Sequence, residues 1–319
     1  MLITYPWCSP TFIFIGMKKI LFILTIFLLC SCKNDDGTNA QTLIPTTPGA
    51  AFVASNNTFA ETYTTLLTTL EANQNITIVA EVDHTANAQS AGLELRNTRL
   101  VLFGNPSLGT PIMQLNPQAG LDLPQKMLVY EDESGSVLVS YNGTDYLVAR
   151  HGVEDAGGLA QIENALSNFA VIATDGTATE RPATAIGLND GVLTVESEND
   201  FATTYTKLRS SIENNENLTI MAQLNHQENA NSVGLDLLPS RIIVFGNPAL
   251  GTPLMQNMQT TALDLPQKML VWENSDGRVM ISYNDPEFLK QRHSITGADT
   301  VLLQITNALQ NLAEGAATL

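Results

Sequence analysis

The four histidines of this sequence are the side chains best suited to proton transfer or metal binding, and they occur as two pairs separated by 142 residues: His84 with His226, and His151 with His293. His84 directly follows Asp83, and a neighbouring carboxylate can orient an imidazole for catalysis or for a metal ion. His84 and His226 are therefore the residues on which a hydrolase-like or metal-using enzyme would be centred.

The second member of the first pair weakens this enzymatic interpretation. Beside His226, the residue that corresponds to Asp83 is Asn225, and Gln223 replaces Glu81. A histidine whose neighbouring acids are not repeated in the second copy more often acts as a cap or forms a hydrogen bond in the core, so a structural role is favoured for His84. The Arg150-His151 and Arg292-His293 dipeptides are expected just before the final helix of each copy, where a structural role is favoured more strongly.

Three basic residues also recur at the same separation, which could reflect a binding site or a shared requirement of folding: Arg99 with Arg241, Lys126 with Lys268, and Arg150 with Arg292. Asp122 and Glu131 flank Lys126, and Asp264 corresponds to Asp122 in the second copy. Asp122 or Glu131 could form an ion pair with Lys126, and buried ion pairs serve structure at least as often as function.

Asn105 and its counterpart Asn247 lie in a turn that follows a predicted strand. Thr110-Pro111 fits the N-cap and first residue of a short helix, whose amides could hold an anion with Arg99 or Lys126 nearby. A tight turn that needs Gly, Asn and Pro is the favoured alternative. The candidates for binding are thus His84, Arg99, Asn105, Asp122, Lys126, His226, Arg241, Asn247, Asp264 and Lys268.

Composition excludes several classes of function. The 319 residues include 15 Lys and Arg against 32 Asp and Glu, a net charge of −17, so nucleic acid is not expected as a partner. All three cysteines lie in the first 32 residues, which leaves no thiol nucleophile or cysteine zinc site in the body. Walker, Gly-x-Ser-x-Gly, His-Glu-x-x-His and Gly-x-Gly-x-x-Gly motifs are missing, and no catalytic residue, metal or cofactor is predicted.

The N-terminus has the pattern of a secretory signal. An apolar run at 20–29 follows Lys18-Lys19 and is too short to span a membrane, which needs about 20 residues. The sequence Leu29-Cys30-Ser31-Cys32 resembles a bacterial lipobox with Cys32 as the lipid attachment site. Cys30 is the competing acceptor, disfavoured because no small residue precedes it. The basic segment begins only at Met17, which is favoured over Met1 as the true start.

Beyond the signal, Lys33-Asn34-Asp35-Asp36 resembles the acidic tethers that send some Bacteroidetes lipoproteins to the cell surface; a solvated linker is the alternative. The expected location is the cell envelope, lipid-anchored at the outer membrane and facing the periplasm or the surface. The expected organisation is a signal peptide at 1–31, a tether at 32–49, a first domain at 50–172, a linker at 173–190 and a second domain at 191–315.

The body of the chain is a duplication, because the 142-residue register holds without a gap from about residue 59 to residue 151. Helical periodicity at 59–70 follows Thr58 and Glu61, a candidate capping box. Strand patterns alternate with these helices and end in a hairpin, which is typical of an α+β domain with an antiparallel sheet. The expected strands are 51–55, 76–82, 99–103, 126–131 and 137–141, with a short helix at 85–91 and a closing helix at 159–169.

Two long strings recur nearly unchanged: residues 103–114 at 245–256, and residues 121–129 at 263–271. Together they resemble the family called domain of unknown function 302, over both copies nearly end to end. The resemblance implies a β-α-β4-α domain similar to the TATA-box-binding-protein-like fold, often dimeric, with no established activity. The tandem copies could form an intramolecular pseudo-dimer. Fold similarity alone gives no reason to infer DNA binding.

Three functions remain open. The leading hypothesis is a non-enzymatic envelope lipoprotein whose two domains bind a small molecule, a lipid or a protein on a sheet face not covered by helices. The second is the hydrolase-like or metal-using enzyme centred on His84 and His226, with Asn105 and Asn247. The third is a structural module that only spaces or dimerises.

Overall fold

A computed structural model describes residues 44–319. The predicted signal peptide, the lipid site at Cys32 and most of the predicted tether lie outside the described residues. The described chain contains two similar copies of one α+β unit, joined by a segment with a short strand and a 3-10 turn.

The elements of the first copy, in chain order, are β1 (Ala50–Ala54), α1 (Phe59–Glu71), β2 (Thr77–Asp83), α2 (His84–Ser90), β3 (Thr98–Gly104), α3 (Pro106–Leu115), η1 (Pro117–Leu121), β4 (Gln125–Glu131), β5 (Val137–Asn142), α4 (Thr144–His151) and α5 (Leu159–Thr174). The connecting segment contains β6 (Ala178–Glu180) and η2 (Ala183–Ala185). The second copy contains β7 (Val192–Glu196), α6 (Phe201–Glu213), β8 (Thr219–Asn225), α7 (His226–Ser232), β9 (Ser240–Gly246), α8 (Pro248–Asn257), η3 (Gln259–Leu263), β10 (Gln267–Glu273), β11 (Val279–Asn284), α9 (Pro286–His293) and α10 (Asp299–Ala317).

Both copies form an antiparallel sheet with the same strand order. The first sheet runs β2-β3-β4-β5-β1-β6, and the second runs β8-β9-β10-β11-β7. The order of the first five strands is therefore identical, and β6 is an added edge strand in a segment that the sequence analysis assigned to a linker. The expected α+β class with two antiparallel sheets is confirmed.

Helix α1 begins at the predicted capping box. The Glu61 amide donates to Thr58 Oγ1 over 3.3 Å, and the Thr58 amide donates to the Glu61 carboxylate over 3.0 Å. These two bonds satisfy amides that the first helical turn would otherwise leave free. The equivalent helix α6 has Asp200 as its N-cap, with no acid at the third position.

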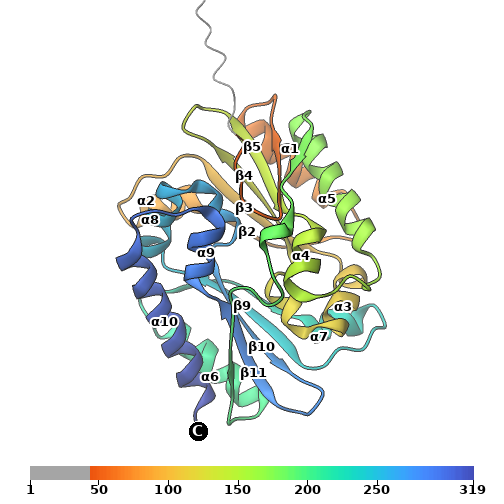
Figure 1. The fold of residues 1–319 in the computed structure, drawn as a ribbon, viewed down its shortest axis with the longest axis vertical. Helices are drawn as coiled ribbons and strands as arrows, with labels where there is room; N and C mark the ends of the chain where they lie inside the picture. Colours follow the sequence, from red (N-terminus) through yellow and green to blue (C-terminus); the bar gives the residue numbers. More distant parts are fainter. Residues whose placement is uncertain (1–43) are drawn as a thin grey trace, which may run out of the picture. The chain divides into compact units, whose positions relative to one another are not determined.

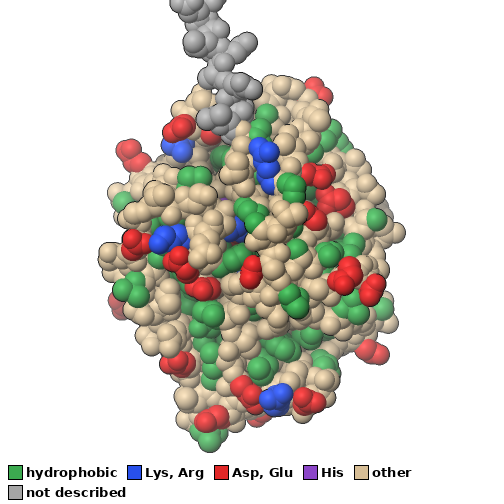
Figure 2. Space-filling model, viewed as in Figure 1, with side chains coloured by type: hydrophobic (Ala, Val, Ile, Leu, Met, Phe, Trp, Pro, Cys, Tyr) green, Lys and Arg blue, Asp and Glu red, His purple; other side chains and the backbone are tan. Residues whose placement is uncertain are grey.

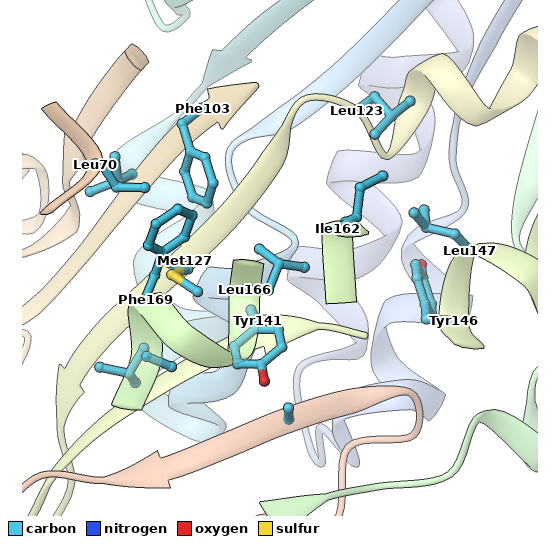
Figure 3. Close-up of a cluster of buried hydrophobic side chains, with 14 of the residues drawn as sticks. Leu70, Phe103, Leu123, Met127, Tyr141, Tyr146, Leu147, Ile162, Leu166 and Phe169 are labelled. Atoms are coloured by element: carbon cyan, nitrogen blue, oxygen red, sulfur yellow. The ribbon is translucent and has the colours of Figure 1, made fainter. Parts of the chain in front are cut away.

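One face of each sheet is covered by its own two long helices. In the first copy, α1 and α5 lie side by side over the sheet (Figure 1). Figure 3 shows the core between them, where Phe103, Met127 and Tyr141 of the sheet meet Leu166 and Phe169 of α5. Alternate strand residues point to this face, as the period of two requires.

The other face of each sheet packs against the opposite copy. Leu100, Leu102 and Leu128 of the first sheet cluster with Leu263 and Leu265 of the second copy. Conversely, Leu121 of η1 inserts against Ile242, Leu270 and Trp272 of the second sheet. Helix α2 lies beside α8, and α3 lies beside α7 (Figure 1). The sheet face that the sequence left without a helix is thus occupied mainly by a domain–domain contact.

The surface is acidic, as the composition requires. On the face drawn in Figure 2, Asp and Glu side chains are spread over the molecule and Lys and Arg are few. Within residues 44–319, no helix combines the length and the apolar character needed to cross a membrane.

Candidate functional site

The first candidate region is a set of charged side chains buried where the two copies meet. We call it the central charged cluster; its members are Asp122, Lys126, Arg150, His151, Asp264, Lys268, Arg292 and His293. The acids follow η1 and η3, the lysines lie at the second residue of β4 and β10, and the arginine and histidine end α4 and α9. Each member of one copy has its counterpart 142 residues along the chain.

Within each copy, the acid is held by the arginine and the histidine of one helix. Asp122 Oδ2 lies 2.7 Å from Arg150 Nη1 and 2.8 Å from His151 Nε2. The second copy repeats this arrangement, with Asp264 Oδ2 2.6 Å from Arg292 Nη1 and 2.8 Å from His293 Nε2.

The lysines cross between the copies. Lys126 Nζ lies 3.4 Å from Asp264 Oδ1, and Lys268 Nζ lies 3.9 Å from Asp122 Oδ1. The predicted local pairing of Lys126 with Asp122 or Glu131 is therefore wrong. Glu131 instead accepts a hydrogen bond from Asn97, because β4 carries it to the far end of the strand from Lys126.

The arginines also reach across the contact. Arg150 Nη2 donates to Asn284 Oδ1 over 2.9 Å, and Arg292 Nη2 donates to Asn142 Oδ1 over 2.8 Å. The guanidinium carbon of Arg292 lies 4.0 Å from the centre of the Tyr146 ring. These directional contacts make the cluster a specific joint between the copies.

Burial raises the pKa of the Asp122 carboxyl, but the charges of Arg150 and Lys268 and the hydrogen bond from His151 hold it well below its usual range. Burial also raises the pKa of the Asp264 carboxyl, but the charges of Arg292 and Lys126 hold it well below its usual range. Burial and the adjacent Lys126 lower the pKa of Lys268 well below its ordinary value. Both acids are thus held in the ionised form, chiefly by the arginine of their own copy.

None of these side chains lines either of the two cavities described below. A buried, mutually paired cluster without access for a substrate is a structural device, since removing one partner would leave an uncompensated charge. Of the ten predicted candidates, Asp122, Lys126, Asp264 and Lys268 are therefore brought together in a joint between domains.

Arg99 and Arg241 lie apart from that joint, on the surface. Arg99 Nη2 pairs with Asp83 at 2.7 Å, and Arg241 Nη2 lies 3.8 Å from Glu228. Each guanidinium also covers a tyrosine ring of its own copy, Tyr63 at 5.0 Å for Arg99.

Asn105 and Asn247 are the N-caps of α3 and α8. The Asn105 side chain accepts from the Ser107 amide over 3.0 Å, and Pro106 takes the first helical position. The expectation that Thr110 caps this helix is wrong. Asn105 is the N-cap, and asparagine is a stronger N-cap residue than threonine. The helix therefore begins before Thr110, and Pro111 lies inside it. The Asn105 side chain accepts from the helix amide itself. Arg99 and Lys126 form ion pairs with Asp83 and Asp264.

His84 and His226 open the short helices α2 and α7 and are buried against the opposite copy. Burial lowers the pKa of His84 to about 4, against a hydrogen bond with the backbone of Leu265 that acts to raise it. Burial likewise lowers the pKa of His226 to about 4, opposed by a backbone hydrogen bond at Gly120. Asp83 does not direct His84 toward a substrate, because it caps α2 through the Ala86 amide.

Two cavities lie at corresponding places in the copies, between the end of the sheet, the closing helix and the histidine helix of the other copy. The first has a volume of about 420 Å³ and is lined by Phe103, Leu166 and Phe169 of the first copy and by His226 of the second. The second has a volume of about 70 Å³ and is lined by Phe245 and Leu309 of the second copy and by His84 of the first.

The same three polar side chains line both cavities, and each has an atom buried without a hydrogen-bond partner in the protein. In the first cavity these atoms are Thr110 Oγ1, Gln125 Nε2 and His226 Nε2. In the second they belong to Thr252, Gln267 and His84. Unpaired buried atoms are not confined to these walls, because Asp122 Oδ1, His151 Nδ1 and Lys268 Nζ of the central charged cluster also have no hydrogen-bond partner.

The two cavities differ in several wall residues, and one of these differences bears directly on their size. Val79 lines the first and Met221 the second, at equivalent positions. Each is the residue at which the pairing of the edge strand shifts register, and a bulge of this kind re-aims a side chain. The Met221 methyl lies 3.4 Å from the position that a Cβ on Gly246 would take, so the longer side chain occupies space that Val79 leaves open.

Sequence reasoning identified His226 but missed Gln125, Thr110 as a wall residue, and Val79. Gln125 and Thr110 lie inside the two strings that recur nearly unchanged. Their identity with Gln267 and Thr252 is the sequence feature that could have marked them as candidates. Val79 carried no such signal, since its counterpart is a different residue. Within residues 44–319, no group of three or more His, Cys, Asp or Glu side chains is placed to hold a metal ion.

Comparison with known proteins gives the family. The model of the family described as "Domain of unknown function DUF302" matches residues 52–170 and again residues 193–312. A solved DUF302 protein from Bacillus stearothermophilus is similar at 20% identity and a TM-score of 0.36, over 40% of this chain and 98% of that one. The di-domain ARO/CYC protein StfQ of the steffimycin biosynthetic pathway matches at 9% identity and a TM-score of 0.20, over 84% of this chain and 95% of that one.

Curated relatives include the fluoride-specific ion channel FluC 1 of Brucella suis biovar 1, 38% identical over 114 residues. The FluC 1 of Brucella abortus biovar 1 is also 38% identical over 114 residues. The match covers 36% of this chain and 44% and 42% of those relatives. The chain thus spans less than half the length of the curated relatives that it matches.

Proposed function

This chain belongs to the DUF302 family, and we propose that it is a binding protein that takes a small molecule into the cavity of its first copy. One observation carries the proposal: a cavity of about 420 Å³ with mostly apolar walls is lined by side chains of both copies, among them the polar residues Thr110, Gln125 and His226. Ligand sites are typically apolar cavities of about 300–1,000 Å³ with a few polar groups that fix orientation.

The energetic reason lies in the apolar surface of the walls. Phe103, Leu166 and Phe169 line the cavity, and a ligand that covers these side chains removes apolar surface from water, which is the main favourable contribution to most binding.

The site is composite, because the second copy contributes Leu224, His226 and Asn229 to a cavity otherwise built by the first. We therefore propose that the tandem copies act as an intramolecular pseudo-dimer in which each supplies a wall of the other's cavity. A single copy would lack His226 at this site.

We further propose that the protein is an envelope lipoprotein anchored at the outer membrane through lipid on Cys32. The support is the basic residues, short apolar run and lipobox-like Leu29-Cys30-Ser31-Cys32 of the sequence. Mass spectrometry of the N-terminal peptide from the native host should find a lipid-modified Cys32. Cys32→Ser should abolish the modification and Cys30→Ser should not; lipid on Cys30 would contradict the assignment.

The hydrolase-like or metal-using alternative centred on His84 and His226 is not favoured. Both rings are buried and uncharged at neutral pH, and Asp83 is engaged by α2 and Arg99. Asn105 and Asn247 serve as helix caps.

The test is binding of the uncharged apolar dye Nile red, alongside native mass spectrometry of the protein purified from its own cells. We expect one dye per chain and a co-purified small molecule. Val79→Met should weaken dye binding at least tenfold, because it places the longer side chain of the second cavity into the first. Met221→Val is the matched control and should leave the first site intact. Dye binding that Val79→Met does not change would contradict the proposal.

A further inference from the structure

We propose that a surface groove at one side of the contact between the copies is a docking site for a peptide segment of another protein, one that carries an apolar side chain beside a lysine or an arginine. The groove has a volume of about 280 Å³ and lies between the end of α3 and the start of η1 in the first copy and the loop that leads into β9 in the second. Among the described residues that line it, only Met113 also lines the first cavity, so the groove is a separate site.

On the opposite side of the contact, the equivalent place is bridged by hydrogen bonds between the copies; we call it the bridged junction. Arg96 Nε and Nη2 donate to Gln259 Oε1 over 3.1 and 3.0 Å, and Gln259 Nε2 donates to Thr98 Oγ1 over 2.7 Å. These bonds link the segment before β3 of the first copy to η3 of the second.

The groove and the bridged junction are the same place with the copies exchanged. At the groove, Gln114 Nε2 donates to the Asp236 carbonyl over 2.7 Å. At the bridged junction, Gln256 Nε2 donates to the Glu94 carbonyl over 2.6 Å. Each of these residues lies 142 positions from its counterpart, so the two places can be compared residue by residue.

The comparison shows that the groove has become apolar. Three polar residues of the bridged junction have apolar counterparts that line the groove: Arg96 is replaced by Leu238, Asn97 by Pro239, and Gln259 by Pro117. Leucine and proline side chains have no hydrogen-bond donor or acceptor, so the bridging bonds have no equivalent here. Leu238 is left 43% exposed. Apolar residues gathered at one place on a surface mark an interaction site, unlike scattered single ones.

The rim of the groove is acidic and unpaired. Asp236 and Glu273 line it, and within residues 44–319 neither carboxylate has a hydrogen bond or an ion pair. In the first copy the counterpart of Glu273 is Glu131, which accepts from Asn97 Nδ2 over 2.9 Å. Pro239 at the position of Asn97 removes that donor. A lysine or arginine of a partner would supply a donor and a counter-charge together.

The charge of the molecule favours a basic partner over a second copy of this chain. An apolar centre with a polar rim is the usual arrangement of a protein interface. The net charge of −17 attracts a basic segment and steers its approach. A second copy would instead bring its own excess of acids toward Asp236 and Glu273, which like-charge repulsion opposes.

The experiment is selection of a phage library of random 12-residue peptides on the full chain, followed by fluorescence anisotropy with the selected peptides in synthetic form. We expect the selected peptides to share an apolar residue beside Lys or Arg. Because the rim contributes charge, their binding should weaken at least threefold between about 50 and 500 mM NaCl. Selected peptides without a basic residue, or a selection that enriches no peptide, would overturn the proposal.

The double variant Leu238→Arg, Pro117→Gln locates the binding, because it places at the groove the two side chains that close the bridged junction. It should weaken peptide binding at least tenfold, while thermal unfolding and Nile red binding stay near those of the unchanged protein. Leu303→Arg is the matched control, since Leu303 is 60% exposed on α10 and does not line the groove; it adds a similar charge and should leave peptide binding unchanged.

Equal binding of the peptides to the double variant and to the unchanged protein would overturn the assignment to the groove. Analytical ultracentrifugation tests the other occupant. A dimer of the unchanged protein that the double variant abolishes would assign the groove to a second copy and overturn the choice of partner.

Discussion

The central charged cluster and the two cavities are both formed by side chains that recur in the two copies, yet they differ in charge. In the cluster, Asp122 Oδ2 and Asp264 Oδ2 are each held by two partners at 2.6–2.8 Å. Among the described residues, no Asp, Glu, Lys or Arg lines either cavity. Repetition of a residue therefore does not by itself distinguish a buried joint from the wall of a cavity; the charge and packing around the residue do.

The two cavities add a second contrast. Their polar sets are the same, but the first has about 420 Å³ and the second about 70 Å³. Val79 against Met221 is one cause, and Phe169 against Leu312 on the closing helix is another difference in the walls. Both copies thus keep the same three polar wall residues, and the first copy has the larger cavity.

The largest expected effect comes from the cluster. Asp122→Asn should lower the free energy of unfolding by about 3–5 kcal/mol, because Arg150 and Lys268 would remain buried without their acid. Urea unfolding followed by circular dichroism measures it. Asp264→Asn should have an effect of similar size; a loss below about 1 kcal/mol in both would show that the cluster does not hold the copies together.

The histidines at the cavities predict a pH dependence of stability. His84 and His226 have a pKa of about 4 in the folded protein, below the ordinary 6.5. The unfolded chain therefore binds more protons between these values, so stability is complete above pH 6.5 and falls as the pH drops toward 4. Each histidine can contribute about 3 kcal/mol to this loss.

Urea unfolding at a series of pH values tests this dependence. His293 has a pKa that burial lowers in the same direction, so it adds to the same window. Asp122 and Asp264, whose pKa values lie well below their usual range, lose their contribution only below about pH 4. The double variant His84→Gln, His226→Gln should flatten the curve between pH 6.5 and 4, and an unchanged slope would contradict the assignment.

The contrast between the cavities can be removed by one substitution. Met221→Val should enlarge the second cavity and raise the number of Nile red molecules bound per chain from one to two, because the polar set there is already present. Native mass spectrometry counts the bound dye. An unchanged count would show that Leu312 or another wall residue, rather than Met221, limits the second site.

The smallest effect is expected at the surface. Arg99→Ala removes an ion pair with Asp83 and a contact with the Tyr63 ring, and since Arg99 is 42% exposed the loss should stay within about 1 kcal/mol. Arg241→Ala should be equally mild. A larger loss, or any change in dye binding, would give these arginines a role that the cluster and cavities do not predict.

Local patterns predicted much of the fold correctly. The strands and long helices follow from periods of two and 3.6 residues, and the capping box of Thr58 and Glu61 acts within three residues. The start of α3 was misplaced because Asn105 and Thr110 each precede a proline, and the N-cap was assigned to Thr110 although asparagine is the stronger N-cap residue. Helix α4 was missed as a separate element, since its eight residues carry little periodicity.

By itself, the sequence determined the duplication, the α+β class, the acidic surface and the residues that recur, because these depend on composition and on neighbours along the chain. Only the tertiary structure decided the partners. Lys126 pairs with Asp264, 138 residues away, rather than with the adjacent Asp122, and His226 completes a cavity in the opposite copy. The physical reason is that burial and pairing at this contact depend on how two sheets dock, and the docking brings together residues that no local pattern relates.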